Sequence, residues 1–320
     1  MHTRRAFLDV FLCLVATRQL ATCLLEVAPD DAAALIAKAG EVAIDRNIVF
    51  FLGDDLTPGG AAEFSLKSLQ KVNVTCVLIG LYGAPPSAAF PFASHVVHLT
   101  QAPQCVQPER RRTVSCWRLF LMALLLRHEF HVFLADFDVF FLLNPFPYLD
   151  TRMDVHVMSD AMNLAQLAYM DLPPGGTAFG KVLDPKQKVP FLWSQQVAVF
   201  NVGTMYVRAT RESQEAFHVV REWLANTSFW EQQVVSLQVL SLSLQGALRL
   251  KVWDPRLVMN SGFWVNFKAQ LRHPPIAFHA SAHGDKLAAM KEFASSTFPT
   301  TEPFQGLHMV DFSGPYGVQL

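Results

Sequence analysis

Two aspartates, Asp136 and Asp138, are the residues of this chain whose type and spacing most clearly indicate chemistry, and they directly follow the apolar segment 131–135. In an extended segment, residues of the same parity point to one face, so both carboxylates converge while Phe137 points away. Two like charges this close repel each other and raise one pKa. A hard divalent cation such as Mg²⁺ or Mn²⁺ removes that conflict and also binds phosphate oxygens. The pair therefore predicts a metal site that clamps a diphosphate.

Two other interpretations of this motif are open. An Asp-x-Asp triplet can cap a helix or lie in a solvated turn, but here it interrupts the apolar run 132–143, where unpaired acids are costly to bury. The motif also fits a phosphotransferase of the haloacid dehalogenase type, in which the first acid is an aspartyl nucleophile. That family needs another acidic pair downstream, whereas the adjacent pairs Asp30-Asp31 and Asp54-Asp55 lie upstream. The phosphotransferase is therefore the weaker alternative.

Alternating strands and helices have to position the two acids. Short continuous apolar runs predict buried strands, and apolar residues at helical spacing predict the helices between them. The expected strands cover residues 47–53, 74–81, 131–135, 139–143, 155–158, 197–207, 248–253 and 276–279, and the expected helices cover 61–71, the segment after 112, 212–225 and 230–244. This order predicts an α/β fold with a largely parallel sheet covered on both faces. Ligands of such sheets bind at the carboxyl ends of the strands, where the acids lie.

Composition restricts the class of protein. Of the 320 residues, 51% are hydrophobic and 17% charged, which supplies a large core and excludes a mostly disordered chain. The formal net charge of −1 gives no basic surface for a phosphate backbone, so we expect no nucleic-acid partner. After the first twenty residues there is no stretch of about 18 uncharged apolar residues, which excludes a multi-span membrane protein.

The first residues have the order of a secretory signal. Arg4 and Arg5 precede the mainly apolar stretch 6–16, and Arg18 is followed by the small residues Ala21-Thr22-Cys23. We expect residues 1–23 to be a signal peptide or a short membrane anchor, which leads the protein to the Golgi lumen and allows membrane association through the N-terminus only. Because Asp9 lies inside the apolar stretch, an ordinary N-terminal helix of a cytosolic protein stays an alternative.

Two further features bear on the compartment. The sequons at Asn73 and Asn226 would carry glycans in the secretory lumen if both lie on the surface. Of the five cysteines, Cys76, Cys105 and Cys116 follow the leader and permit at most one intramolecular disulfide. Their spacing does not resemble a zinc site.

The segment FLADFDVFFLLNPFPYL resembles the Asp-x-Asp block of the nucleotide-diphospho-sugar transferase family of plants and algae, which includes arabinosyl-, xylosyl- and galactosyltransferases of the secretory pathway. Further blocks follow in the family's order, namely Trp117-Arg118, Ser159-Asp160, residues 200–208 (FNVGTMYVR) and Phe278-His279-Ala280. The resemblance predicts a transferase domain at 45–293 and a C-terminal tail at 294–320. It implies a Rossmann-like GT-A glycosyltransferase fold, a uridine-diphosphate sugar as donor, and Mn²⁺ or Mg²⁺ as cofactor.

The resemblance also implies roles for individual residues. The residues expected to hold the metal are Asp136, Asp138 and His279. Those expected at the donor are Asp136, Arg118, Asn201, Gly203 and Lys286. Those expected to act on the sugar are the candidate catalytic residues Glu231, Gln232 and Asp160.

Two positions depart from the family's pattern. Glu231 stands where relatives carry Asp before an apolar helix, which extends the acid by one methylene group. Its role as a nucleophile, as a stabiliser of an oxocarbenium ion, or as neither is left open. Ser281 follows Ala280 where Asn is commoner in the family.

We therefore expect a metal-dependent hexosyl- or pentosyltransferase that moves a sugar to a protein or glycan hydroxyl with retention of anomeric configuration. A non-catalytic sugar- or nucleotide-binding relative is the alternative from another class. Aromatic residues that could bind the acceptor are more often core residues, and this applies to Trp193, Trp230, Trp253 and Trp264.

Overall fold

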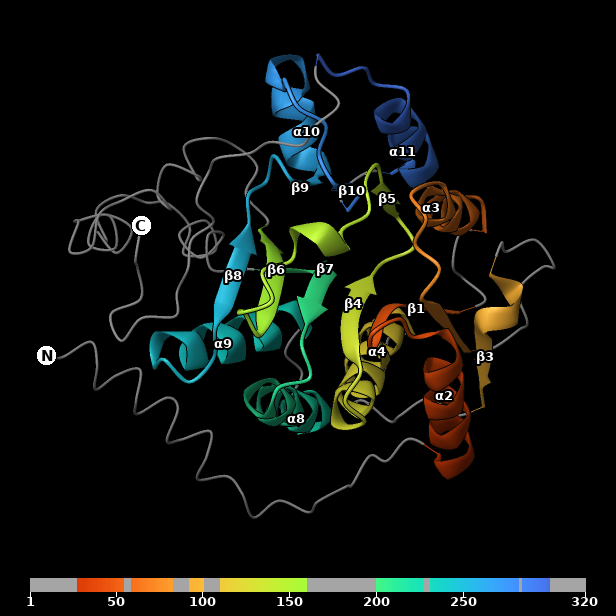
Figure 1. Cartoon of the computed structure of the whole chain (residues 1–320), viewed down its shortest axis with the longest axis vertical. Helices are drawn as coiled ribbons and strands as arrows, with labels where there is room; N and C mark the ends of the chain where they lie inside the picture. Colours follow the sequence, from red (N-terminus) through yellow and green to blue (C-terminus); the bar gives the residue numbers. More distant parts are fainter. Residues whose placement is uncertain are drawn as a thin grey trace, which may run out of the picture.

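The computed structural model describes residues 28–54, 59–82, 92–100, 110–159, 200–226, 231–281 and 284–299. Within these ranges the centre of the molecule is a seven-stranded sheet in the order β3-β2-β1-β4-β7-β6-β8 (Figure 1). Its strands are β1 (Asn47–Asp54), β2 (Val77–Tyr82), β3 (Val96–Leu99), β4 (His131–Ala135), β6 (Val155–Ser159), β7 (Phe200–Val207) and β8 (Leu250–Trp253).

This sheet is largely parallel. β1 pairs in parallel with β2 and β4, β2 with β3, and β6 with β8. Among the described strands of the sheet, β7 alone runs the other way, between β4 and β6. The α/β class with a largely parallel central sheet, which the sequence predicts, is therefore confirmed.

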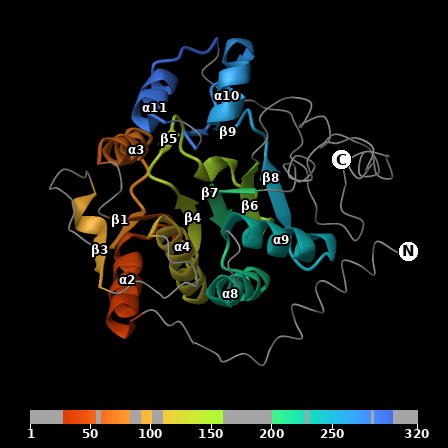
Figure 2. The same ribbon diagram turned by 180° about the vertical axis from the view of Figure 1, so that it is seen from behind.

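Helices cover both faces of the sheet, as the opposite views in Figures 1 and 2 show. On one face lie α2 (Pro29–Val42), α4 (Arg110–Arg127), α8 (Arg211–Asn226) and α9 (Glu231–Leu244). On the other lie α3 (Gly59–Lys71) and a three-stranded sheet of β5 (Val139–Phe141), β10 (Ala277–His279) and β9 (Val258–Asn260). The helices α10 (Ser261–Phe267) and α11 (Lys286–Ala294) pack against this small sheet. Short 3₁₀ turns lie at Ala93–His95, Phe146–Tyr148 and Lys268–Gln270.

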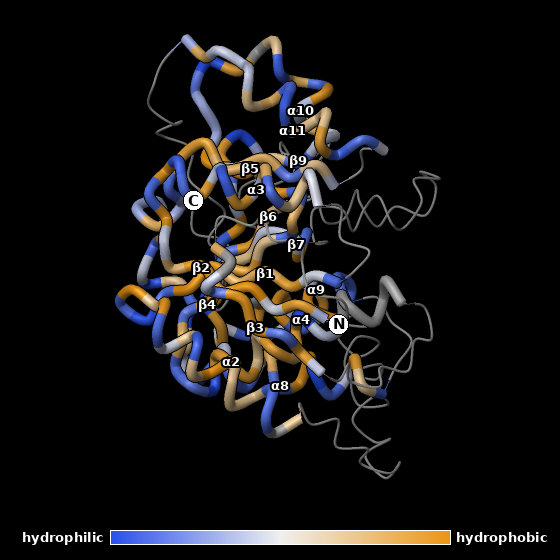
Figure 3. The backbone as a smooth tube through the Cα atoms, turned by 90° about the vertical axis from the view of Figure 1, so that its right-hand side faces the viewer, coloured by the Kyte–Doolittle hydropathy of each residue, from blue (hydrophilic) through white to orange (hydrophobic). Residues whose placement is uncertain are grey.

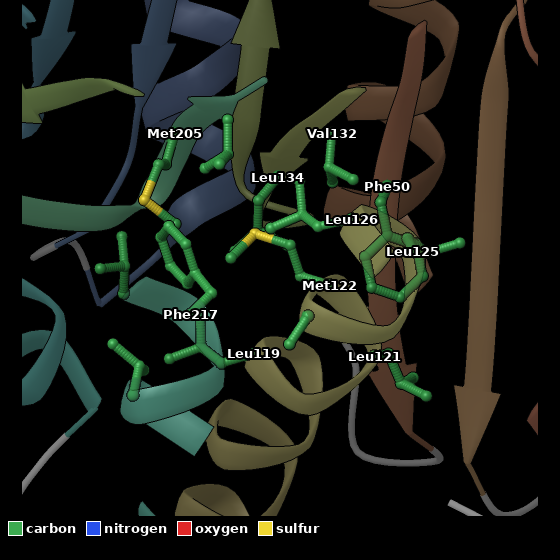
Figure 4. Packing of buried hydrophobic residues seen from close by; sticks show 14 of the residues in the cluster. Phe50, Leu119, Leu121, Met122, Leu125, Leu126, Val132, Leu134, Met205 and Phe217 are labelled. Carbon is green, nitrogen blue, oxygen red and sulfur yellow. The ribbon is translucent and has the colours of Figure 1, made fainter. Parts of the chain in front are cut away.

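Both faces of the central sheet are buried because neighbouring residues of one strand enter different cores. Phe50 of β1 packs in the cluster under α4 and α8, whereas Phe51 packs on the other face. Figure 4 shows the first cluster, in which Met122 and Phe217 lie beside Met205. Figure 3 shows the same layering, with hydrophobic colour concentrated along the central strands. The uninterrupted apolar runs are therefore the signature of strands buried on both sides.

Five elements have no counterpart in the sequence analysis: α2, β3, β9, α10 and α11. The two strands among them span only Val96–Leu99 and Val258–Asn260, too short for a clear period. Helix α2 lies before the expected domain start at residue 45. It is attached to the sheet by Asp31, which accepts a hydrogen bond from the Thr100 N–H over 2.8 Å.

No helix in the described part of the chain is long and apolar enough to cross a membrane. The expected leader at 1–23 lies outside the described residues.

The side chain of His156 is buried in β6. The ring of His156 lies 5.3 Å from the Trp253 ring and 5.8 Å from the Tyr206 ring, and its Nε2 accepts the Asp150 N–H over 3.1 Å. Burial, and after it the charge of Lys251, lowers the pKa of His156 from 6.5 to about 3. The folded protein therefore holds this side chain neutral.

We expect His156 to make the protein less stable as the pH falls from about 6.5 toward 3. In this window the unfolded chain binds a proton on His156 that the folded chain excludes, which costs up to about 1.4 kcal/mol of unfolding free energy per pH unit. His156→Gln keeps an acceptor for the Asp150 N–H but does not titrate. Urea unfolding at a series of pH values gives the free energy of unfolding of both proteins. The difference between wild type and variant should become smaller toward acid pH. A difference that is the same at every pH would contradict the prediction.

Candidate functional site

Asp136 and Asp138 lie in a tight turn between β4 and β5. The Val139 N–H donates to the Asp136 carbonyl over 3.1 Å, which closes the turn, and the Asp136 N–H donates to the Gly203 carbonyl over 2.8 Å. Phe137 turns inward and stacks on a buried ring of β1 with centroids 5.0 Å apart. The predicted convergence of the two carboxylates is confirmed, but a turn produces it rather than the alternation of an extended strand.

Neighbouring elements fix β5 and with it the turn. On one side β5 pairs antiparallel with β10, which places His279 opposite Val139. On the other side two serines of α3 take the place of a strand: Ser68 Oγ accepts the Phe141 N–H over 2.9 Å, and Ser65 Oγ donates to the Val139 carbonyl over 2.5 Å. The turn is therefore held by its own backbone, by a strand and by a helix.

Asp136, Asp138 and His279 form a cluster that can hold a metal ion. Each offers a ligand atom, and these atoms lie within 4.8 Å of one another. His279 Nε2 lies 3.1 Å from Asp138 Oδ1 and 3.6 Å from Asp136 Oδ2. The other ring nitrogen of His279, Nδ1, is buried and has no hydrogen-bond partner among the described residues. Two carboxylates and an imidazole suit a divalent cation.

Exposure shows from which side a ligand reaches this cluster. The side chains of Asp138 and His279 are 7% and 4% exposed, whereas that of Asp136 is 32% exposed. A cation bound here would therefore meet solvent and substrate on the Asp136 side.

Basic groups of the chain already surround the two acids. Arg118 of α4 bonds to Asp136, and Lys286 of α11 bonds to Asp138. Burial by itself would raise the pKa of Asp138, but the charges and hydrogen bonds of His279 and Lys286 hold it well below its usual range. Burial likewise opposes the charged form of His279, yet Asp138 and Asp136 raise its pKa. The repulsion expected between the acids is thus offset without a metal.

Gly203 leaves the space in which the cluster is built. A Cβ at this position would lie 2.3 Å from His279 Cε1 and 2.5 Å from Asp136 Oδ2, closer than side-chain atoms can approach. The buried Asn201 accepts the Gly203 N–H at its Oδ1 over 2.9 Å, which shapes the start of β7. Two of the metal-ligand candidates, His279 and Asp136, therefore lie in the space that a side chain at position 203 would fill.

Glu231 and Gln232 are buried at the start of α9, next to the cluster. Arg118 Nη2 lies 3.5 Å from Glu231 Oε1, so one guanidinium joins Glu231 to Asp136. Ser236 Oγ accepts the Phe200 N–H over 2.9 Å and donates to the Gln232 carbonyl, which fixes α9 on β7. Arg118 itself is 8% exposed, so it lies inside the site and not in a surface ion pair.

Asn260 is a neighbour of the site that the sequence analysis does not single out. It lies opposite His279 in the parallel pairing of β9 and β10. Its side chain accepts the Phe263 N–H over 2.8 Å and so caps α10. An Asn directly after a short apolar run is a helix-start signal that could have revealed it.

Other predicted residues lie in the core or outside the described residues. Trp253 and Trp264 are buried in the hydrophobic cores, as expected for most tryptophans of this chain. Asp160, Trp193 and Trp230 lie outside the described residues.

A candidate metal cluster at the carboxyl end of β4 in a largely parallel sheet has the arrangement of α/β enzymes, whose ligands bind at this edge. Residues 94–293 match the family model described as nucleotide-diphospho-sugar transferase, and the chain belongs to this family. It is accordingly a glycosyltransferase that uses a nucleotide sugar.

Known relatives agree with this class. Arabinosyltransferase RRA1 of Arabidopsis thaliana is 27% identical over 286 residues, which cover 83% of this chain and 67% of the relative. Arabinosyltransferase RRA2 of the same plant is 30% identical over 175 residues, which cover 50% of this chain and 38% of the relative. Among solved structures, the galactosyltransferase LgtC has a TM-score of 0.44 at 14% identity and covers 80% of this chain and 97% of its own. A likeness at this TM-score says nothing about donor or acceptor.

Replacing Gly203 with Ala should disrupt the cluster. The added methyl group overlaps His279 and Asp136, so at least one ligand has to move, and overpacking of this kind costs about 1–3 kcal/mol. We expect lower thermal stability and loss of stabilisation by Mn²⁺. Gly40→Ala is the matched control, because a Cβ there meets nothing within 4 Å. Equal Mn²⁺ responses in both variants would show that Gly203 is not needed for the cluster.

Proposed function

We propose that this glycosyltransferase binds a divalent metal, Mn²⁺ or Mg²⁺, through Asp136, Asp138 and His279 and thereby holds the diphosphate of a uridine-diphosphate sugar. The observation that carries the proposal is the set of three ligand atoms within 4.8 Å at the sheet edge. When bound, the cation neutralises charge that develops on the departing diphosphate. Arg118 keeps Asp136 in place, and Gly203 leaves room for the ligands.

We further propose that Glu231, Gln232 and Asp160 act at the donor sugar, with Asn201 beside them. The support for Glu231 is its burial at the start of α9 and its link to Asp136 through Arg118. A carboxylate so close to the metal cluster can stabilise positive charge on the sugar. The proposed transfer retains anomeric configuration and uses a protein or glycan hydroxyl as acceptor. Because two relatives are named arabinosyltransferases, a nucleoside-diphosphate pentose is the first donor to test.

We also propose that the protein works in the secretory pathway, in the Golgi lumen. The basic and apolar order of residues 1–23 supports a leader or a short anchor, followed by a transferase domain at 45–293 and a tail at 294–320. The exposure of Asn73 and Asn226 supports glycosylation at these two residues. Membrane association through the N-terminus only, and no nucleic-acid partner, complete the proposal.

Asp138→Asn should strongly reduce transfer while leaving the fold intact. The substitution keeps the volume of the side chain but removes the charge that holds the cation, so turnover of the donor should fall at least about 100-fold. Because Asp138 is paired with His279 and Lys286, the variant should also be slightly less stable than wild type, and not more stable as relief of repulsion would give. Donor hydrolysis and transfer, measured over a panel of nucleotide sugars, test this.

Asp150→Asn is the matched control, because this acid pairs with Arg152 and Lys251 near the start of β6. It should keep full turnover. Unchanged transfer in a folded Asp138→Asn variant would remove Asp138 from the mechanism. A wild type inactive with every nucleotide sugar would favour the non-catalytic relative, and a hydroxylamine-sensitive phosphoryl adduct on Asp136 would favour the phosphotransferase.

In a eukaryotic cell the protein should lose its leader or remain anchored by it, and it should gain N-linked glycans. We expect a glycosidase that removes N-linked glycans to lower its mass, and Asn73→Gln and Asn226→Gln to remove the change stepwise. Mass spectrometry of protein from fractionated cells gives the result. Full-length cytosolic protein with an intact N-terminus would refute the proposed compartment.

A further inference from the structure

Lys286 forms an ion pair with Asp138, whose carboxylate is one of the proposed metal ligands. Asp138 has two oxygens: Oδ1 lies 3.1 Å from His279 Nε2, and Oδ2 accepts a hydrogen bond from Lys286 Nζ. A divalent cation bound to this carboxylate at about 2.1 Å would lie beside the ammonium group. Because two cations at such a distance repel each other, the metal and Lys286 compete for Asp138. Binding of the metal through Asp138 therefore weakens the ion pair between Lys286 and this carboxylate.

The position of Lys286 in the fold allows it to leave. Its side chain is 40% exposed, whereas that of Asp138 is 7% exposed, so the lysine reaches into the site from the solvent side. It is the first residue of α11, after Asp285, which caps the helix by accepting the Ala288 N–H over 2.9 Å. A cation at a helix N-terminus is unfavourable because backbone N–H groups already make that end positive. The pairing with Asp138 offsets this cost.

We propose that Lys286 is a resident counter-ion of the metal site, which neutralises Asp138 in the metal-free protein, is displaced by the metal, and then pairs with the diphosphate that the metal brings. This inference rests on the proposed function, in which the site takes a divalent cation and a nucleoside diphosphate. Once displaced, Lys286 and the N-terminus of α11 both need an anion, and the diphosphate supplies one. Metal and nucleotide therefore bind with positive coupling, each weakly alone and tightly together.

Lys286→Met tests this, because methionine keeps much of the stem and removes the charge. Titration calorimetry with Mn²⁺ alone, and with Mn²⁺ and UDP, gives the affinities. Without its competitor, Mn²⁺ alone should bind about 10-fold more tightly to the variant than to wild type, whereas UDP at saturating Mn²⁺ should bind about 10-fold more weakly. The factor by which Mn²⁺ and UDP raise each other's affinity should be smaller in the variant than in wild type. A lysine that served the diphosphate alone would weaken UDP binding without changing the affinity for Mn²⁺.

Lys291→Met on the same helix is the matched control, since Lys291 is exposed and the substitution changes the net charge by the same amount. It should leave both affinities unchanged. Lys286→Gln is a second variant, and circular dichroism verifies that each variant is folded. Unchanged or weaker Mn²⁺ binding in both folded Lys286 variants overturns the inference, while wild type that still binds UDP with Mn²⁺ leaves the proposed function intact. Wild type and variants that bind neither ligand would refute the proposed function and the inference together.

Discussion

The structure around the site depends on one electrostatic constraint: two carboxylates share one tight turn, and one of them is almost fully buried. Charges that lie this close inside a protein need opposite charge nearby. The chain supplies it from three separate elements, with Arg118 from α4, His279 from β10 and Lys286 from α11. The placement of these elements around β4 therefore determines the geometry of the acidic cluster.

The reversed direction of β7 is the second determinant of the site. Because β7 runs against its neighbours, its first residues, and not its last, lie beside the carboxyl end of β4. Asn201 and Gly203 therefore enter the site from the beginning of a strand. A parallel strand in the same place would bring its opposite end there, and the close approach of His279 and Asp136 to a glycine would be lost.

The sequence predicts the elements that carry strong local signals. β1, β4 and β6 follow from their apolar runs, and α8 follows from its helical spacing, with boundaries within about one residue. The Asp-x-Asp pair is recognisable because it interrupts an apolar run. The metal-ligand candidates, including the distant His279, also follow from the order of the family's blocks.

What the sequence could not predict depends on contacts between distant residues. Lys286 and Asp138 are 148 positions apart, so no local pattern reports their pairing. An apolar run has no direction, which is why the antiparallel course of β7 is invisible in it. The turn at Asp136 and the salt link from Arg118 to Glu231 likewise exist only once α4, α9 and the sheet have packed together.

The two serines of α3 have a consequence for how the molecule behaves among its own copies. β5 is one of the two outer strands of the small sheet, and such a strand normally exposes backbone groups to which a strand of another molecule can add. The hydroxyls of Ser65 and Ser68 on α3 form hydrogen bonds with the Val139 carbonyl and the Phe141 N–H of this strand. These two backbone groups are therefore not available to pair with a strand of another molecule. The same contacts that hold the acidic turn in place thus close this side of the small sheet to self-association.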